Sequence, residues 1–208
     1  MSEKANYRII ATDFKKTILR ERFIMSSVNQ DRERLLEILK KDAFFKEKII
    51  LSSGKESDYY IDARRVTLSA EGAYLCAKII LDMVKDDAIS IVGGPTLGAD
   101  PFVGAIASQS FENKKPVSTF IIRKAPKAHG KQQQIEGPEI PKGSKVILID
   151  DVATTGKAFV QSLEVMKNAE INVVKAICIV DRNEGAKQAI AKYNCPLQSI
   201  FQISDFLD

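Results

Sequence analysis

The sequence of 208 residues has no tryptophan, a single histidine and three cysteines. The cysteines (Cys76, Cys178 and Cys195) have no C-x-x-C spacing, which excludes the usual zinc and redox motifs. Their odd number, and the apolar runs around the first two, argue against a disulfide framework. No apolar run reaches the length of a membrane span, and the charged N-terminus lacks the apolar core of a signal peptide. We therefore expect a protein of the reducing cytoplasm, without a membrane partner.

A strong charge of one sign is also missing. The 31 basic and 27 acidic residues leave a formal net charge of +4, which gives little reason to expect a nucleic-acid partner. Hydrophobic residues make up 45% and charged residues 28% of the chain, as in ordinary globular proteins. The length suits one domain with a small appendage. A small polyanionic substrate would account for any local basic patch.

The most informative stretch is Val146–Ala158, with the sequence VILIDDVATTGKA. Its four apolar residues predict a strand over 145–149 that is buried on both faces. Two adjacent acids, Asp150 and Asp151, follow at the carboxyl end of that strand, where open α/β sheets bind their ligands. Thr154, Thr155 and Gly156 then predict a turn that caps a helix over 155–169.

These residue types suggest a particular ligand. Backbone N–H groups of residues 153–157 and the two threonine hydroxyls would form an anion cradle at a helix N-terminus. The acids would repel that anion, so they are better suited to sugar hydroxyls or to a cation. A phosphate next to a vicinal diol is a ribose 5-phosphate. A Walker P-loop would require glycine where Asp151 stands, whereas a buried strand that merely ends in solvated acids remains the simpler alternative.

Buried strands alternate with amphipathic helices along the rest of the chain, which predicts an α/β fold with a doubly wound, mostly parallel sheet. An N-terminal helix and a β-hairpin would form a small hood over the strand ends, with Ser69 capping the first core helix and Ser204 a last helical turn. We expect an N-terminal extension of unknown role over 1–28 and one domain over 29–208, with the hood at about 29–68 and the core at about 69–208. The predicted strands cover 48–51, 58–61, 88–92, 117–122, 145–149, 173–180 and 197–202, and the predicted helices cover 31–41, 69–84, about 101–108, 155–169 and 184–193.

Three further stretches of the sequence are candidates for the same ligand-binding site. The glycine-rich turn over 93–101 would let the backbone approach a ligand closely, or would simply join a strand to a helix. The basic, aperiodic segment over 123–137 is typical of a lid that closes over polyphosphate, or of a solvated loop. Arg182 ends a predicted strand and should share the rim of Asp150 and Asp151. Arg64 and Arg65, by contrast, are interpreted as a solvated strand end.

The stretch at 146–158 closely resembles the phosphoribosyl-pyrophosphate (PRPP) motif of type I phosphoribosyltransferases. Three other stretches resemble orotate phosphoribosyltransferases in particular: the hood segment 53–64 (SGKESDYYIDAR), the lid 123–130 (RKAPKAHG) with 135–137, and the strand end 180–182 (VDR). Together they cover most of residues 30–208 but not 1–28. The chain departs from the family pattern at Ser52, where many members carry lysine.

The resemblance implies transfer of the 5-phosphoribosyl group from PRPP to orotate in pyrimidine biosynthesis. It implies four catalytic residues, Lys127, His129, Asp150 and Asp151. For orotate it implies Arg182 at the carboxylate, Thr154, and Tyr60 and Ile61 over the pyrimidine face. The residues that would bind PRPP are Arg123, Lys124, Lys127, His129, Asp150, Asp151, Val152, Ala153, Thr154, Thr155, Gly156, Lys157 and Ala158.

The resemblance also implies Mg²⁺ bound mainly through PRPP, without a dedicated protein ligand, and a homodimer that shares its lid across the interface. Two alternatives stay open. The chain could be a phosphoribosyltransferase for another nucleobase, against which Arg182 argues, or a PRPP-binding regulator without turnover, against which Lys127 and His129 argue. A nucleic-acid binder that uses the basic segment would need interleaved aromatic residues, which that segment lacks.

Overall fold

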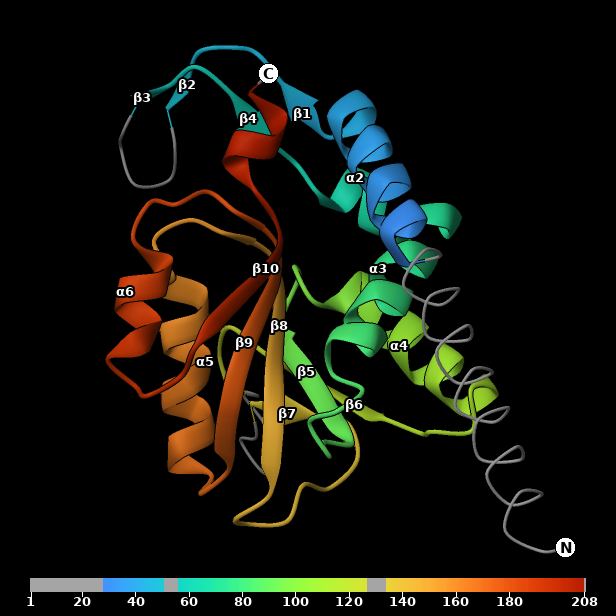
Figure 1. Ribbon diagram of the computed structural model, residues 1–208. Coiled ribbons are helices and arrows are strands. Elements are labelled where there is room, and N and C mark those ends of the chain that lie inside the picture. Colours follow the sequence, from blue (N-terminus) through green and yellow to red (C-terminus); the bar gives the residue numbers. More distant parts are fainter. Residues whose placement is uncertain (1–27, 51–55, 127–133, 208) are drawn as a thin grey trace, which may run out of the picture.

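A six-stranded sheet forms the centre of the computed structural model, which describes residues 28–50, 56–126 and 134–207 (Figure 1). The strand order is β10-β9-β8-β5-β6-β7. All neighbouring strands are parallel except β7, which pairs antiparallel with β6. The predicted doubly wound, mostly parallel sheet is confirmed. The strands are β5 (Ile91–Pro95), β6 (Ser118–Ile122), β7 (Ile135–Glu136), β8 (Lys145–Ala153), β9 (Asn172–Asp181) and β10 (Leu197–Gln202).

Helices cover both faces of this sheet. Helices α3 (Ala70–Met83) and α4 (Asp100–Glu112), with the helix over residues 28–42, lie on one side, and α5 (Lys157–Asn168) and α6 (Ala186–Ala191) lie on the other (Figure 1). The short α2 (Arg64–Thr67) joins the hood to α3, and a 3₁₀ turn, η1 (Ile203–Phe206), ends the described chain. None of these helices is long and apolar enough to cross a membrane.

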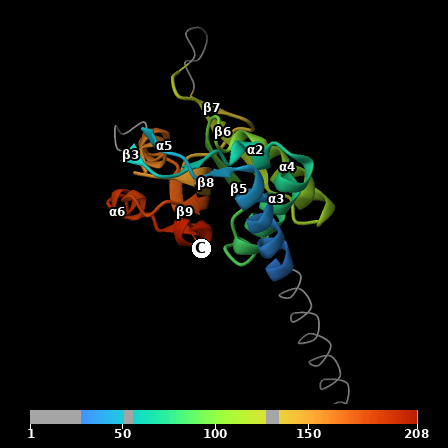
Figure 2. The ribbon, with the colours of Figure 1, turned by 90° about the horizontal axis from the view of Figure 1, so that it is seen from above.

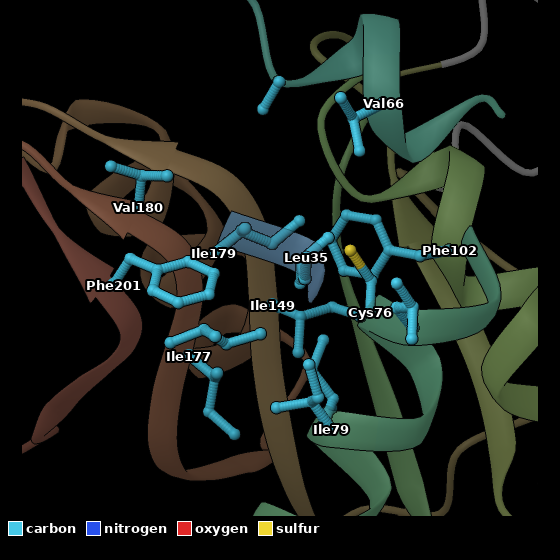
Figure 3. Close-up of a cluster of buried hydrophobic side chains, with 14 of the residues drawn as sticks. Leu35, Val66, Cys76, Ile79, Phe102, Ile149, Ile177, Ile179, Val180 and Phe201 are labelled. Carbon is cyan, nitrogen blue, oxygen red and sulfur yellow. The ribbon is translucent and has the colours of Figure 1, made fainter. Parts of the chain in front are cut away.

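The apolar run of β8 feeds two separate cores. Ile147 and Ile149 pack into the cluster beneath α3 and α4, part of which is drawn in Figure 3, whereas Val146 and Leu148 pack into the cluster beneath α5 and α6. All four side chains are fully buried. Because successive side chains of a strand point to opposite faces, a strand covered on both sides must be apolar at every position. This is why the run in the sequence predicts the strand correctly.

The hood lies over the carboxyl ends of the central strands, and its pairing differs from the prediction (Figures 1 and 2). Strand β2 (Ile49–Ile50) pairs with β3 (Glu56–Ser57), so the predicted partner strand over 58–61 is wrong. Residues Tyr60–Ile61 instead form β4, which pairs antiparallel with β1 (Phe44–Phe45). The aromatic rings explain this choice, since Tyr60 stacks on Phe45 with centroids 6.4 Å apart and Ile61 is buried in the core.

Of the three predicted helix caps, the structure confirms the one at α3 and contradicts those at α5 and η1. The Ser69 hydroxyl accepts a hydrogen bond from the Gly72 N–H at 3.0 Å and caps α3, as expected. The predicted threonine cap of α5 is wrong, because the helix begins after Gly156, whose φ of +81° is left-handed, and neither threonine nor any other described side chain caps it. The Ser204 cap is also wrong, because Gln202 and Asp205 form a reciprocal capping box at η1.

Candidate active site

The acid pair lies within β8, near its carboxyl end, and not in the loop beyond it. The strand continues to Ala153, four residues further than predicted. Asp150 is buried and its Oδ1 accepts a hydrogen bond from the Asp151 N–H at 3.0 Å, while Asp151 Oδ1 accepts one from the Val152 N–H at 2.7 Å. These backbone hydrogen bonds hold both carboxylates at the carboxyl edge of the sheet, where the sequence placed them.

The glycine-rich turn between β5 and α4 packs directly against this pair. A Cβ on Gly98 would lie 1.9 Å from Asp150 Oδ1 and 2.8 Å from Asp151 Oδ1. A Cβ on Gly94 would lie 1.8 Å from the carbonyl oxygen of Ile149. The turn also contains a cis peptide between Thr96 and Leu97. The turn therefore packs closely against the neighbouring strand and its carboxylates, whereas its approach to a ligand stays a prediction.

Burial sets the electrostatics of the two acids. It raises the pKa of Asp150 well above its usual value, and the adjacent charge of Asp151 raises it further, with a smaller contribution from Asp100. Burial also raises the pKa of Asp151, although the Val152 N–H and the Arg64 guanidinium act in the opposite direction. Two neighbouring carboxylates that are costly to ionise call for a partner that supplies positive charge or hydrogen-bond donors.

Arg64 belongs to the surroundings of this pair. It begins α2 instead of ending a strand, and its Nε lies 3.0 Å from Asp62 Oδ1. The hydrogen bond to Asp62 and its charge raise the pKa of Arg64, and the charge of Asp151 makes a smaller contribution in the same direction. The interpretation of this arginine as a solvated strand end is therefore wrong, since it begins a helix, is only half-exposed and interacts electrostatically with Asp151.

The segment after the acids, where the sequence predicts an anion cradle, leads into the N-terminus of α5. It runs from Ala153 to the first residues of α5, with Thr155, Lys157 and Ala158 exposed and Thr154 and Val152 half-buried. The left-handed Gly156 turns the chain into the helix, and a Cβ there would lie 3.0 Å from Ala186 Cα. Among the described residues no side chain caps α5, so its first N–H groups are suited to an anion.

Arg182 lies at the neighbouring strand end but is buried instead of lining an open rim. Its backbone N–H donates to the carbonyl of Ala153 at 2.9 Å, which ties it to the cradle. Its guanidinium lies 4.7 Å above the ring of Tyr59, and its Nη2 donates to Ser57 Oγ at 3.2 Å. Its Nε is 2.8 Å from Glu184 Oε1.

Sequence reasoning missed three of these neighbours, namely Ser57, Tyr59 and Glu184. The hood residues are more than 120 positions away in the chain, so no local pattern could have found them. Tyr60 and Ile61, which were predicted to cover orotate, lie beside Phe45 and in the core, respectively. Their contact with orotate stays a prediction, as does that of Thr154.

The segment that was predicted as a structureless lid begins and ends as a hairpin. The N–H of Arg123 donates to the carbonyl of Gln134 at 2.8 Å, and its Nη1 lies 3.3 Å from Glu136 Oε1 on β7. Lys124 is exposed beside it. Lys127 and His129, the predicted catalytic residues of the lid, lie outside the described residues.

Comparison with known proteins agrees with this geometry. Residues 67–206 match the family model described as "Phosphoribosyl transferase domain". An orotate phosphoribosyltransferase of Synechocystis is 41% identical over 176 residues, which are 85% of this chain and 88% of the relative.

Two solved structures of the Mycobacterium tuberculosis orotate phosphoribosyltransferase share the fold. One is a complex with Fe(III) dicitrate and has a TM-score of 0.75 at 34% identity, covering 86% of this chain and 99% of the other. The other is a complex with PRPP and has a TM-score of 0.71 at 31% identity, covering 85% and 98%. With the acid pair, the cradle and the arginine at the adjacent strand end already in place, the chain belongs to the orotate phosphoribosyltransferase family.

Proposed function

We propose that this chain transfers the 5-phosphoribosyl group of PRPP to orotate, giving orotidine 5′-monophosphate and diphosphate. The observation that carries the proposal is the meeting of two unlike sites at one edge of the sheet. The acid pair and cradle of β8 and α5 suit a ribose 5-phosphate, and the buried guanidinium of Arg182 suits a carboxylate. The hydrogen bond from the Arg182 N–H to the carbonyl of Ala153 holds the two together.

On the ribose side, the transition state gains positive charge at the anomeric carbon as diphosphate leaves. Asp150 and Asp151 accept hydrogen bonds from the ribose hydroxyls and stabilise that charge electrostatically. Residues 153–158 hold the 5′-phosphate through their backbone N–H groups, since in the part of the chain that the structure describes no side chain caps the N-terminus of α5. This arrangement fixes the anomeric carbon relative to the attacking base.

On the base side, Arg182 pairs with the orotate carboxylate, because its planar fork can donate two parallel hydrogen bonds to it. Attack then comes from N1 of orotate. Thr154 lies on the cradle beside this position and contacts the base, while Tyr60 and Ile61 belong to the hood strand β4 that covers it. A purine or uracil has no carboxylate, so it cannot form this pair with the buried guanidinium.

The leaving group is handled by the lid. Arg123 and Lys124 bind the oxygens of diphosphate from the start of this segment, and Lys127 and His129 complete the set. A cation above the diphosphate lowers the barrier because negative charge develops there in the transition state. Arg123 already lies at the base of the β6–β7 hairpin, where it is paired with Glu136.

Mg²⁺ accompanies PRPP in this proposal. The hard carboxylate oxygens of Asp150 and Asp151 fit this cation, although among the described residues no group of three His, Cys, Asp or Glu side chains could hold a metal ion. The ion would neutralise phosphate charge and would be held mainly by PRPP oxygens and water.

We propose further that the enzyme works in the cytoplasm as a homodimer whose lid reaches the neighbouring site. Residues 29–208 form one catalytic domain, with the hood at about 29–68 and the core at about 69–208, and residues 1–28 precede it as an extension without an assigned role.

The decisive experiment follows orotate consumption by absorbance with PRPP and Mg²⁺, beside uracil and hypoxanthine. We expect turnover that depends on orotate, PRPP and Mg²⁺ together. Turnover of hypoxanthine or uracil alone would reassign the base, and PRPP binding without any turnover would identify a regulator.

Arg182→Ala should mainly weaken orotate binding. We expect the KM for orotate to rise by about 100-fold, the scale of two charge-assisted hydrogen bonds, with a small change in the KM for PRPP. Arg182→Lys keeps the charge but loses the fork, so it should recover only part of this loss. Steady-state kinetics in both substrates check the expectation, and a selective loss of PRPP affinity would contradict the assignment.

A further inference from the structure

The Arg182 guanidinium is held on three sides by residues that have no assigned role. The Tyr59 ring supports one face at 4.7 Å, Ser57 Oγ accepts from Nη2 at 3.2 Å, and Glu184 Oε1 lies 2.8 Å from Nε. Only 5% of the arginine side chain is exposed, against 21% of the Glu184 side chain. Two of the holders come from the hood, whereas Glu184 comes from the core.

The backbone after Arg182 explains how Glu184 reaches it. Asn183 has a left-handed φ of +57°, and its N–H donates to Asp181 Oδ1 at 2.9 Å. Gly185 has a φ of +107° and opens α6. These two left-handed residues reverse the chain on either side of Glu184, so its carboxylate returns to the arginine two residues earlier instead of entering solvent.

We propose that Glu184 is a positioning residue for orotate: it fixes the Nε edge of Arg182 so that the Nη edge faces the carboxylate of the base. This inference rests on the proposed function, since it concerns the same arginine. Glu184 does not touch the substrate. It acts by setting the rotation of the guanidinium, which has five donors in one plane and can present only one pair of them to a bound carboxylate.

The charge of Glu184 is as important as its shape. A buried guanidinium without a counter-charge is costly in the free enzyme, and Glu184 supplies that charge before orotate arrives. The Nε N–H is not aimed at a hydrogen-bonding acceptor in the described structure, so the contact with Glu184 is an ion pair. Orientation through an ion pair depends on the charge, which a glutamine would remove while keeping the size of the side chain.

The test compares Glu184→Gln with the wild-type enzyme in both substrates. We expect the KM for orotate to rise by roughly tenfold, the scale of losing one of the two charge-assisted hydrogen bonds between Arg182 and the orotate carboxylate, while kcat at saturating orotate and the KM for PRPP stay close to wild type. A merely structural role would lower kcat or weaken both substrates. Thermal melting of the variant confirms that it folds.

Glu37→Gln is the matched control, since it removes a glutamate from a surface ion pair, with Arg34 at 3.1 Å, far from the site. It should leave all three constants unchanged. An unchanged orotate KM in Glu184→Gln, or an equal rise in both KM values, would overturn the inference while leaving the proposed function standing. A wild-type enzyme that does not turn over orotate would overturn the proposed function, and the inference with it.

Discussion

Replacing Asp150 by asparagine is expected to abolish most of the activity while making the ligand-free protein more stable. Asparagine has the same shape and can still accept the hydrogen bond from the Asp151 N–H, which spans 3.0 Å in the native protein. It cannot supply the negative charge that stabilises the ribose cation. We expect kcat/KM to fall on the order of 100-fold, as for the loss of other preorganised electrostatic groups.

The gain in stability follows from the raised pKa of Asp150. A buried carboxyl whose pKa is higher in the folded protein than in the unfolded chain makes unfolding easier at neutral pH. Stability is lost as pH rises from the unfolded pKa, about 3.9, through the higher folded value. Asparagine does not titrate. The gain in the free energy of unfolding of Asp150→Asn over wild type should therefore be greatest at neutral pH and should disappear near pH 4.

Thermal melting between about pH 4 and pH 8 measures this difference. Each kcal/mol corresponds to roughly 2–4 °C in a chain of this length, so a shift of a few degrees is expected at neutral pH. Asp82→Asn is the control, because Asp82 forms a surface pair with Lys85 at 3.0 Å. If the Asp150→Asn variant were less stable than wild type at pH 7, the buried carboxylate would stabilise the folded protein, and the expectation would be contradicted.

The sequence predicts the sheet and the acid pair well because both depend on local patterns. Four consecutive apolar residues can be satisfied only by a strand covered on both faces, and the two cores beneath Ile147 and Val146 meet that condition. The position of Asp150 then follows from the end of the apolar run. Even so, the run gives no sign that β8 continues to Ala153.

The hood and the surroundings of Arg182 depend on contacts between distant parts of the chain. Strands of two residues, such as β2 and β3, are too short to show a periodic pattern, so their partners cannot be read from the sequence. Ser57 and Tyr59 meet Arg182 only because the hood folds over the sheet. Glu184 lies two residues from Arg182 in the sequence, but the sequence does not predict the left-handed turn that brings its carboxylate to the guanidinium.

A methyl group at Gly98 is expected to inactivate the enzyme without unfolding it. The added Cβ would lie 1.9 Å from Asp150 Oδ1 and 2.8 Å from Asp151 Oδ1, closer than atoms can approach. The nearest atoms belong to side chains, so the carboxylates can rotate away while the sheet stays intact. Since a misplacement of about 1 Å at a reacting centre can cost 100-fold, we expect a loss of that order in kcat/KM.

Gly104 provides the matched control for this substitution. It lies on α4, the helix that follows the same turn, and a Cβ there would meet nothing within 4 Å. Gly104→Ala should keep full activity and raise the free energy of unfolding by about 0.5–1 kcal/mol, because alanine loses less conformational freedom in a helix. Steady-state kinetics and thermal melting separate the two variants. If Gly98→Ala kept its activity, the acids would not need the positions that this turn imposes on them, and their role at the ribose would have to be reassigned.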